Sequence, residues 1–177
     1  MSEPRLRPPA LDPAAVPEVS RTDYPEPYRT LVAGRVWRAL GDALGLTQFG
    51  VNLVRVEPGS ASSQRHWHTR EDEFVLLLEG ELVLVTDGGE QTLTPGMCAG
   101  FPAGVPDGHH LVNRSDRPAL FLVIGSRVEG DACEYPDIDL RWSVRGGYTH
   151  KSGEPWSEAS VTKPAPAARS SRRADEQ

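Results

Sequence analysis

The chain has 177 residues, of which 38% are hydrophobic and 25% are charged, and its formal net charge is −6. This length predicts one domain with a sizeable core, and the acidic balance argues against a nucleic-acid-binding surface, which needs a basic face. No apolar run approaches the ~18 residues of a membrane span, and no apolar leader opens the chain. We therefore expect a cytoplasmic protein, in which Cys98 and Cys133 are reduced.

Both ends of the chain are predicted to be flexible. Residues 1–28 carry seven prolines, so this arm is expected to be disordered or extended on the surface, without contributing to the core. Residues 151–177 are expected to form a flexible tail, because their end is rich in Ala, Pro, Ser and Arg. The domain is placed at 29–150, with residues 131–142 as an edge strand or flap near its C-terminal end.

The region between the ends has a β pattern. Residues 36–40 are expected to form a short strand or a weak helical turn. Many short strands separated by turn signals are typical of an antiparallel sandwich or barrel. The predicted strands are 47–57, 62–68, 73–78, 81–86, 90–94, 97–101, 109–113 and 119–126.

Four of the five histidines fall into two short clusters, His66 with His68 and His109 with His110. Side chains on a strand alternate between faces, so His66 and His68 should point the same way, about 6.6 Å apart along the backbone. Glu73 can return beside them on the following strand. Two imidazoles and a carboxylate are typical ligands of a transition metal, so this cluster predicts a metal site.

These histidines stand within two motifs that resemble those of the cupin superfamily. In the first motif a glycine precedes His-x-His, a glutamate and, six residues later, another glycine. In the second, a glycine and Pro-x-Gly precede a histidine and, three residues after it, an asparagine. The spacing departs from the family pattern by one extra residue before the first histidine and two before the histidine of the second motif. The corresponding residues are Gly59, His66, His68, Glu73 and Gly80, then Gly96, Pro102, Gly104, His109 and Asn113.

The resemblance implies an all-β fold, a single antiparallel, jelly-roll-like cupin barrel with a metal at its centre. The implied ligands are His66, His68, Glu73 and His109. The metal would be a divalent transition metal: Fe, Mn, Ni or Zn.

Two positions in this ligand set have competitors. Glu73 is preferred over Glu71 and Asp72 because it alone keeps six residues before the motif glycine; the other two are expected to be solvated turn residues. The three-residue spacing to the motif asparagine favours His109. Its neighbour His110 should then face outward, because adjacent strand residues face opposite sides.

A three-His, one-Glu set leaves about two open positions around an octahedral metal, where a small oxygen-rich metabolite can chelate. This predicts a metal-dependent oxygenase or isomerase, with Glu73 as the candidate proton acceptor. Gln64, on the strand face of the histidines, and Asn52 are candidate substrate contacts. The alternatives are a non-catalytic barrel that binds or senses a metabolite, and a barrel whose metal only stabilises the fold.

A homodimer is also predicted, since a small barrel has exposed strand edges that proteins cover or pair. Trp67 should point away from the metal, and large outward aromatics often mark subunit contacts. Trp37 and Trp142 are the other candidates. The remaining expected partner is a small-molecule substrate, with no nucleic acid and no membrane.

Overall fold

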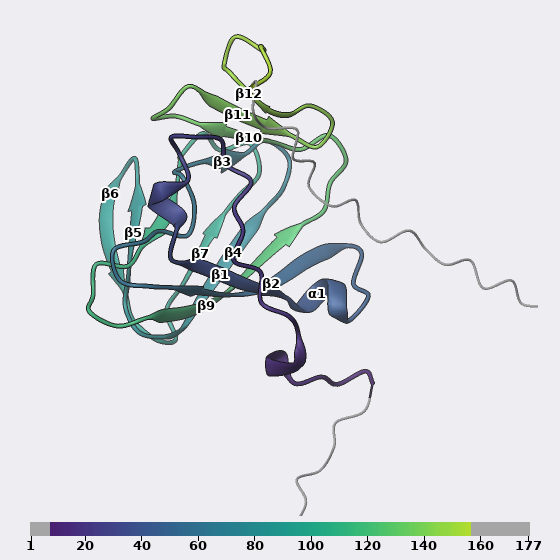
Figure 1. Cartoon of the computed structure of the whole chain (residues 1–177), viewed down its shortest axis with the longest axis vertical. Coiled ribbons are helices and arrows are strands. Elements are labelled where there is room, and N and C mark those ends of the chain that lie inside the picture. The colour runs from purple at the N-terminus through teal and green to yellow at the C-terminus, as the bar shows by residue number, and fades with distance from the viewer. Residues whose placement is uncertain (1–7, 157–177) are drawn as a thin grey trace, which may run out of the picture.

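The computed structural model describes residues 8–156, and these form antiparallel β-sheets with little helix (Figure 1). The predicted all-β class is confirmed. The strands are β1 (Arg35–Ala39), β2 (Phe49–Val56), β3 (Trp67–His68), β4 (Glu73–Glu79), β5 (Leu82–Thr86), β6 (Gly89–Leu93), β7 (Cys98–Phe101), β8 (His110–Val112), β9 (Ala119–Ser126), β10 (Ala132–Tyr135), β11 (Leu140–Ser143) and β12 (Gly147–Thr149). The helical elements are the 3-10 turns η1 (Pro13–Ala15) and η2 (Thr30–Val32) and the helix α1 (Leu40–Ala43).

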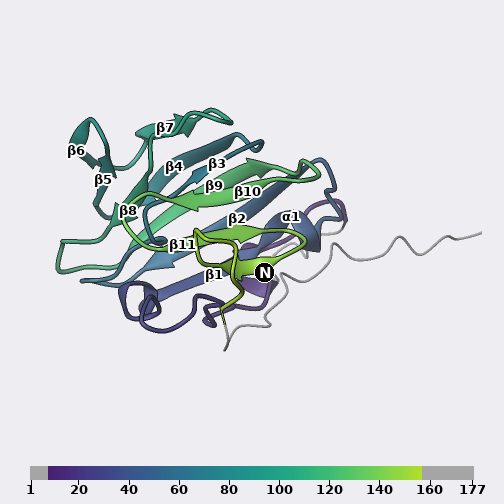
Figure 2. The ribbon, with the colours of Figure 1, turned by 90° about the horizontal axis from the view of Figure 1, so that it is seen from above.

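The strands form three sheets. The largest has the order β1-β2-β9-β4-β7, and β6-β5-β8 and β12-β11-β10-β3 form the other two. Figure 2 shows β4, β9 and β2 running side by side, with β5 and β6 to one side of them. The four-stranded sheet lies at one end of the molecule in Figure 1.

Alternation along the strands of the large sheet separates an inner face from an outer face. On β2, Val54 and Val56 are buried, whereas Leu53 and Arg55, the residues on either side of Val54, are half-buried and face out. The inner side chains pack with those of β5 and β8 into one apolar core. Its members are Val54, Val56, Val75, Leu77, Leu82, Leu84, Leu93, Leu111, Ala119 and Phe121.

The predicted strand 62–68 is wrong for most of its length, because only Trp67–His68 form a regular strand. The segment instead bridges to the region of β8 at two separate points, Ala61 with Val112 and His66 with His109. His66 is five residues after Ala61, but their bridge partners His109 and Val112 are only three residues apart. Residues 62–65 therefore bulge out of the pairing. The Ser62 hydroxyl accepts a hydrogen bond from the backbone N–H of Leu111 at 3.0 Å and stabilises this irregular path.

The expectation that residues 1–28 contribute nothing to the core is also wrong. Its described part, residues 8–28, is mostly extended, as its prolines predict, but it runs along the β-sheets (Figure 1). Val19 exchanges backbone hydrogen bonds of 2.8 and 3.0 Å with Trp37 of β1. Tyr24 is only 5% exposed and belongs to a second core beside the four-stranded sheet. The other members of that core are Val32, Cys133, Tyr135, Leu140 and Trp142.

Two of the three tryptophans proposed as subunit contacts have partners within the chain. Trp142 is 7% exposed in this second core. Trp37 packs against the main core from the inner face of β1. Trp67 is half-buried on β3. The tryptophans therefore do not form the surface patch that sequence reasoning assumed.

Most of the predicted C-terminal tail, and residues 1–7, lie outside the described residues. The described part of the tail ends at Trp156, whose ring stacks on His150 at 4.0 Å and meets Tyr28 edge-on at 5.7 Å. Residues 151–156 therefore contact the domain. None of the helices in residues 8–156 has the length and apolar character needed to cross a membrane.

Gly80, in the turn between β4 and β5, offers a test of the fold. Gly80 and Gly59 share a φ of +78°, a conformation that costs an L-residue about 1–2 kcal/mol. A Cβ on Gly80 would also lie 2.7 Å from the carbonyl oxygen of Pro118, whereas one on Gly59 meets nothing within 4 Å. We expect Gly80→Ala to lower the free energy of unfolding by about 2–4 kcal/mol, and Gly59→Ala by about 1–2 kcal/mol. Urea denaturation measures both, and equal losses would contradict the close packing at Gly80.

Candidate metal centre and its cavity

Three of the predicted ligands converge on the inner side of the barrel. His66 precedes β3, Glu73 opens β4, and His109 directly precedes β8. One ligand atom from each lies within 4.8 Å of the others. His109 Nε2 and Glu73 Oε2 are 2.8 Å apart, and the rings of His66 and His109 are 5.0 Å apart. The backbone bridge between His66 and His109 holds these two histidines side by side.

Backbone and aromatic contacts orient the two histidines. His66 Nδ1 donates to the carbonyl oxygen of Gln64 at 3.0 Å, which leaves Nε2 free to act as a ligand. His109 is 4% exposed, and its ring stacks on Phe101 with an angle of 2° between the planes. Buried His109 Nδ1 has no hydrogen-bond partner among the described residues.

The fourth predicted ligand, His68, belongs to a neighbouring group. Its ligand atoms lie within 4.8 Å of those of His66 and Cys133, but the structure does not bring it into the group that contains Glu73. The His66 and His68 rings are 5.1 Å apart, as their predicted common face requires. The predicted four-residue set therefore appears as two groups that share His66.

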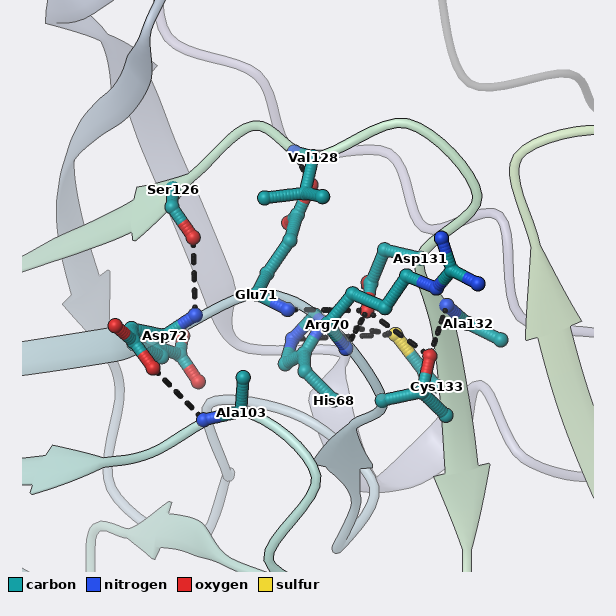
Figure 3. A network of polar contacts seen from close by, with 12 residues as sticks. His68, Arg70, Glu71, Asp72, Ala103, Ser126, Val128, Asp131, Ala132 and Cys133 are labelled. Carbon is teal, nitrogen blue, oxygen red and sulfur yellow. Dashed lines mark hydrogen bonds and ion pairs between the residues drawn. The ribbon is translucent and has the colours of Figure 1, made fainter.

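Asp131 holds His68 in place (Figure 3). His68 Nδ1 donates to Asp131 Oδ2 at 2.7 Å. The other carboxylate oxygen accepts the backbone N–H groups of Arg70 at 2.8 Å and Glu71 at 3.3 Å. Asp131 is only 1% exposed. A carboxylate on one ring nitrogen fixes the tautomer and turns the other nitrogen towards a metal, which is an arrangement that sequence reasoning did not find.

The competing carboxylates serve the backbone. Glu71 accepts the N–H of Val128 at 3.0 Å, and Asp72 accepts that of Ala103 at 2.8 Å (Figure 3). Glu71 and Asp72 were expected to be solvated turn residues, but each holds a neighbouring loop through a backbone hydrogen bond. His110 is half-buried, contributes to the cavity wall and contacts the carbonyl oxygen of Ser63 at 3.1 Å, so it does not face outward.

The donor set fits a divalent transition metal. At metal–nitrogen distances of 2.0–2.1 Å, two ligand atoms on opposite sides of a metal are about 4.2 Å apart. One ligand atom from each of His66, Glu73 and His109 lies within 4.8 Å of the others, so small shifts would bring the three to one ion. A metal held by both His109 and Glu73 would replace the hydrogen bond between them.

Burial and charge set the protonation of this cluster. Burial lowers the pKa of His66 to about 3, so its imidazole is neutral. Burial acts to raise the pKa of Glu73, but the hydrogen bond from His109 and the nearby histidine charges lower it to about 2. Burial acts to lower the pKa of His68, but the hydrogen bonds with Asp131 and Cys133 raise it to about 11. A metal that binds His68 must therefore displace a proton.

The donor group opens into a cavity of about 250 Å³. Asn52, one of the two predicted substrate contacts, lines it. Gln64 does not, and its amide donates to the carbonyl oxygen of Tyr28 at 2.9 Å. Sequence reasoning missed Tyr24, Arg35 and Trp37, which also line the cavity. The i, i+2 spacing of Arg35 and Trp37 was a usable signal, because it places both side chains on one face of β1.

A comparison with solved structures identifies the family. A protein of Silicibacter pomeroyi DSS-3, described as a sugar phosphate isomerase of the cupin superfamily, is 47% identical; the match covers 85% of this chain and 98% of that one, with a TM-score of 0.80. The chain belongs to the cupin superfamily. The Cupin domain model matches residues 52–125 of this cupin. No curated protein sequence matches the chain.

Two further structures resemble this cupin. A protein of Acidithiobacillus ferrooxidans, named provisionally as a sugar phosphate isomerase, is 33% identical over 68% of this chain and 78% of its own, with a TM-score of 0.62. The polyketide cyclase RemF of Streptomyces resistomycificus is 23% identical over 66% of this chain and 78% of its own, with a TM-score of 0.53. The cyclase shows only that the fold is shared.

Proposed function

We propose that this cupin is a metal-dependent enzyme that acts on a small oxygen-rich metabolite, with isomerisation as its reaction. The observation that carries the proposal is the convergence of His66, Glu73 and His109 at a cavity large enough for a small substrate. His68 completes the proposed ligand set. We also propose that the protein is cytoplasmic, where Cys98 and Cys133 would stay reduced.

Relatives favour isomerisation over oxygenation. The proteins that are 47% and 33% identical to this cupin both carry the name sugar phosphate isomerase. A sugar-like substrate has adjacent oxygens, which suit the open positions beside a three-His, one-Glu metal set. A bound divalent metal would act as a Lewis acid on a substrate oxygen and make the neighbouring C–H more acidic.

Glu73 is the proposed proton acceptor. It lines the cavity, and its contact with His109 lowers its pKa to about 2, so the carboxylate is ionised but weakly basic. Without the hydrogen bond from His109 the carboxylate would be a stronger base. Phe101 and the other apolar walls exclude water from the proton that moves.

The proposal is tested with purified protein in three measurements. Elemental analysis should find about one transition metal per chain. Small aldose and ketose phosphates should interconvert, EDTA should abolish the activity, and the metal should restore it. Oxygen uptake with the same compounds would instead support an oxygenase. Metabolite binding to metal-free protein without turnover would favour the sensor alternative and defeat the enzyme proposal.

The choice between the two adjacent histidines gives a separate prediction. We expect His109→Ala to lose most of its metal, because His109 shares the donor group with Glu73. We expect His110→Ala to keep it, since the His110 ring is held by the Ser63 carbonyl oxygen. Metal content by mass spectrometry decides, and loss of metal in His110→Ala alone would reverse the assignment.

The homodimer stays a proposal, and the outer face of the large sheet suits it better than the tryptophans. Leu53, Leu122 and Leu76 are register neighbours across β2, β9 and β4, and all are half-buried. Phe74 beside them is 39% exposed. We expect a dimer in light scattering at micromolar concentration, and a shift towards monomer in Leu122→Glu. A monomeric mass for the wild type would contradict the dimer.

A further inference from the structure

The cavity contains a second group with ligand-binding chemistry, the guanidinium of Arg35. Arg35 lies on the inner face of β1, where its register partner is the buried Val56 of β2. It lines the same cavity as His66, Glu73 and His109. An arginine at the wall of a largely apolar cavity is costly unless its donors are satisfied.

Only part of this guanidinium is satisfied by the protein. Arg35 Nη1 donates to the carbonyl oxygen of Ser62 at 2.7 Å. Its Nε is buried without a hydrogen-bond partner, and among residues 8–156 no carboxylate forms an ion pair with it. An arginine presents its Nε and Nη2 hydrogens along one edge, and neither nitrogen of Arg35 has a hydrogen-bond partner within residues 8–156, so a ligand that reaches this edge would form two parallel hydrogen bonds.

The orientation of Arg35 is fixed by its neighbours. Its guanidinium carbon lies 5.0 Å from the centre of the Trp37 ring, two residues along the same strand face. The Ser62 carbonyl oxygen holds Nη1 through the hydrogen bond described above. Burial raises the pKa of the Tyr24 phenol, and the charge of Arg35 partly opposes that rise, so the two groups are close. The free edge is therefore preorganised before any ligand binds.

We propose that Arg35 binds an oxyanion of the substrate, a carboxylate or a phosphate, through its Nε–Nη2 edge. The substrate then carries an anionic group at one end and metal-chelating oxygens at the other. Asn52, whose side-chain amide has no hydrogen-bond partner within residues 8–156, lies on the inner face of neighbouring β2 and lines the same cavity. A cavity of about 250 Å³ is below the roughly 300–1,000 Å³ of pockets for drug-sized ligands. The anion therefore belongs to a small metabolite.

This inference rests on the proposed function for the metal end of the substrate, but the anion site can be tested alone. Metal-free protein, prepared with EDTA and dialysed, is titrated with inorganic phosphate and with malonate in a calorimeter. The variants are Arg35→Gln, which removes the charge, and Arg35→Lys, which keeps the charge but cannot form the two parallel hydrogen bonds of a guanidinium. Arg55→Gln is the matched control, because Arg55 lies on the outer face of adjacent β2 and pairs with Glu57.

We expect the wild type and Arg55→Gln to bind at least one of the two anions with one site per chain. Arg35→Gln should bind it roughly ten- to a hundredfold more weakly, and Arg35→Lys should fall between them. Binding of phosphate alone identifies a phosphate ester as the substrate class, and binding of malonate alone identifies a carboxylate.

The result that overturns the inference is wild-type binding no tighter than that of Arg35→Gln, with both proteins folded by circular dichroism. If Arg35→Gln does not fold, the wild type is compared with Arg35→Lys instead. Equal anion affinity in these two proteins would exclude paired hydrogen bonds from the guanidinium. All variants are also loaded with metal. Unchanged metal content in Arg35→Gln would show that the anion site and the metal site are independent. Failure of every protein, the wild type included, to bind metal would defeat the proposed function and leave the anion site untouched.

Discussion

Replacing His66 with alanine is expected to lower metal affinity by more than about a hundredfold, a larger loss than the 10–100-fold typical of changes to residues that only orient a ligand. His66 is the residue shared by the donor group of Glu73 and His109 and the group that His68 forms with Cys133. Its free Nε2 is aimed by the hydrogen bond from Nδ1 to the Gln64 carbonyl oxygen. Removal of this imidazole therefore weakens both halves of the proposed ligand set.

The measurement is metal content after equilibrium dialysis against a limiting metal buffer. His150→Ala is the control, because His150 is bound to Asp139 and stacks on Trp156 away from the cavity. Full occupancy in a folded His66→Ala protein would rule out the metal site as assigned. Loss of metal in His150→Ala as well would point to general damage.

Asp131→Asn is expected to weaken metal binding by about 10–100-fold without touching a ligand. The carboxylate of Asp131 accepts the Nδ1 proton of His68, so the proton that a metal displaces is the one on Nε2. An amide at this position can donate to Nδ1 instead, and the proton of His68 then moves to Nε2 and blocks it. The oxygen that accepts the Arg70 N–H remains in asparagine, so the loop should keep its path.

Asp72→Asn is the matched control for this change. Asp72 also anchors a backbone N–H near the site, that of Ala103, but it contacts no histidine. We expect its metal affinity to equal that of the wild type. If Asp131→Asn binds metal as tightly as Asp72→Asn, then His68 is not oriented by Asp131. The NMR shifts of the His68 ring nitrogens would report the tautomer directly.

Side-chain alternation and turn residues made much of this fold predictable. The strand predicted at 119–126 coincides with β9, and that at 73–78 differs from β4 by one residue. The glycine frame and the spaced histidines predicted a donor group from segments that are far apart in the sequence. These features depend on local periodicity, which a single sequence displays directly.

What the sequence did not disclose depends on contacts between distant segments. The 62–68 segment is polar at nearly every position, and its bridges to the chain around β8 impose a bulge that residue periodicity does not reveal. Tyr24 is buried because it packs against the four-stranded sheet. Nothing in the sequence of the proline-rich arm indicates this contact. Asp131 lies 63 residues from the histidine that it orients, so only the pairing of β3 with β10 reveals their relationship.

The pairing of β3 with β10 also sets an order of events during synthesis. His68 lies opposite Cys133 in this pairing, and Asp131 directly precedes β10. A nascent chain that has emerged only to residue 125, the end of the match to the family model, already contains all four proposed ligands. It lacks the carboxylate that orients one of them. Tight metal capture should therefore follow the arrival of β10 and come late in translation, when the newly made barrel closes at its C-terminal sheet.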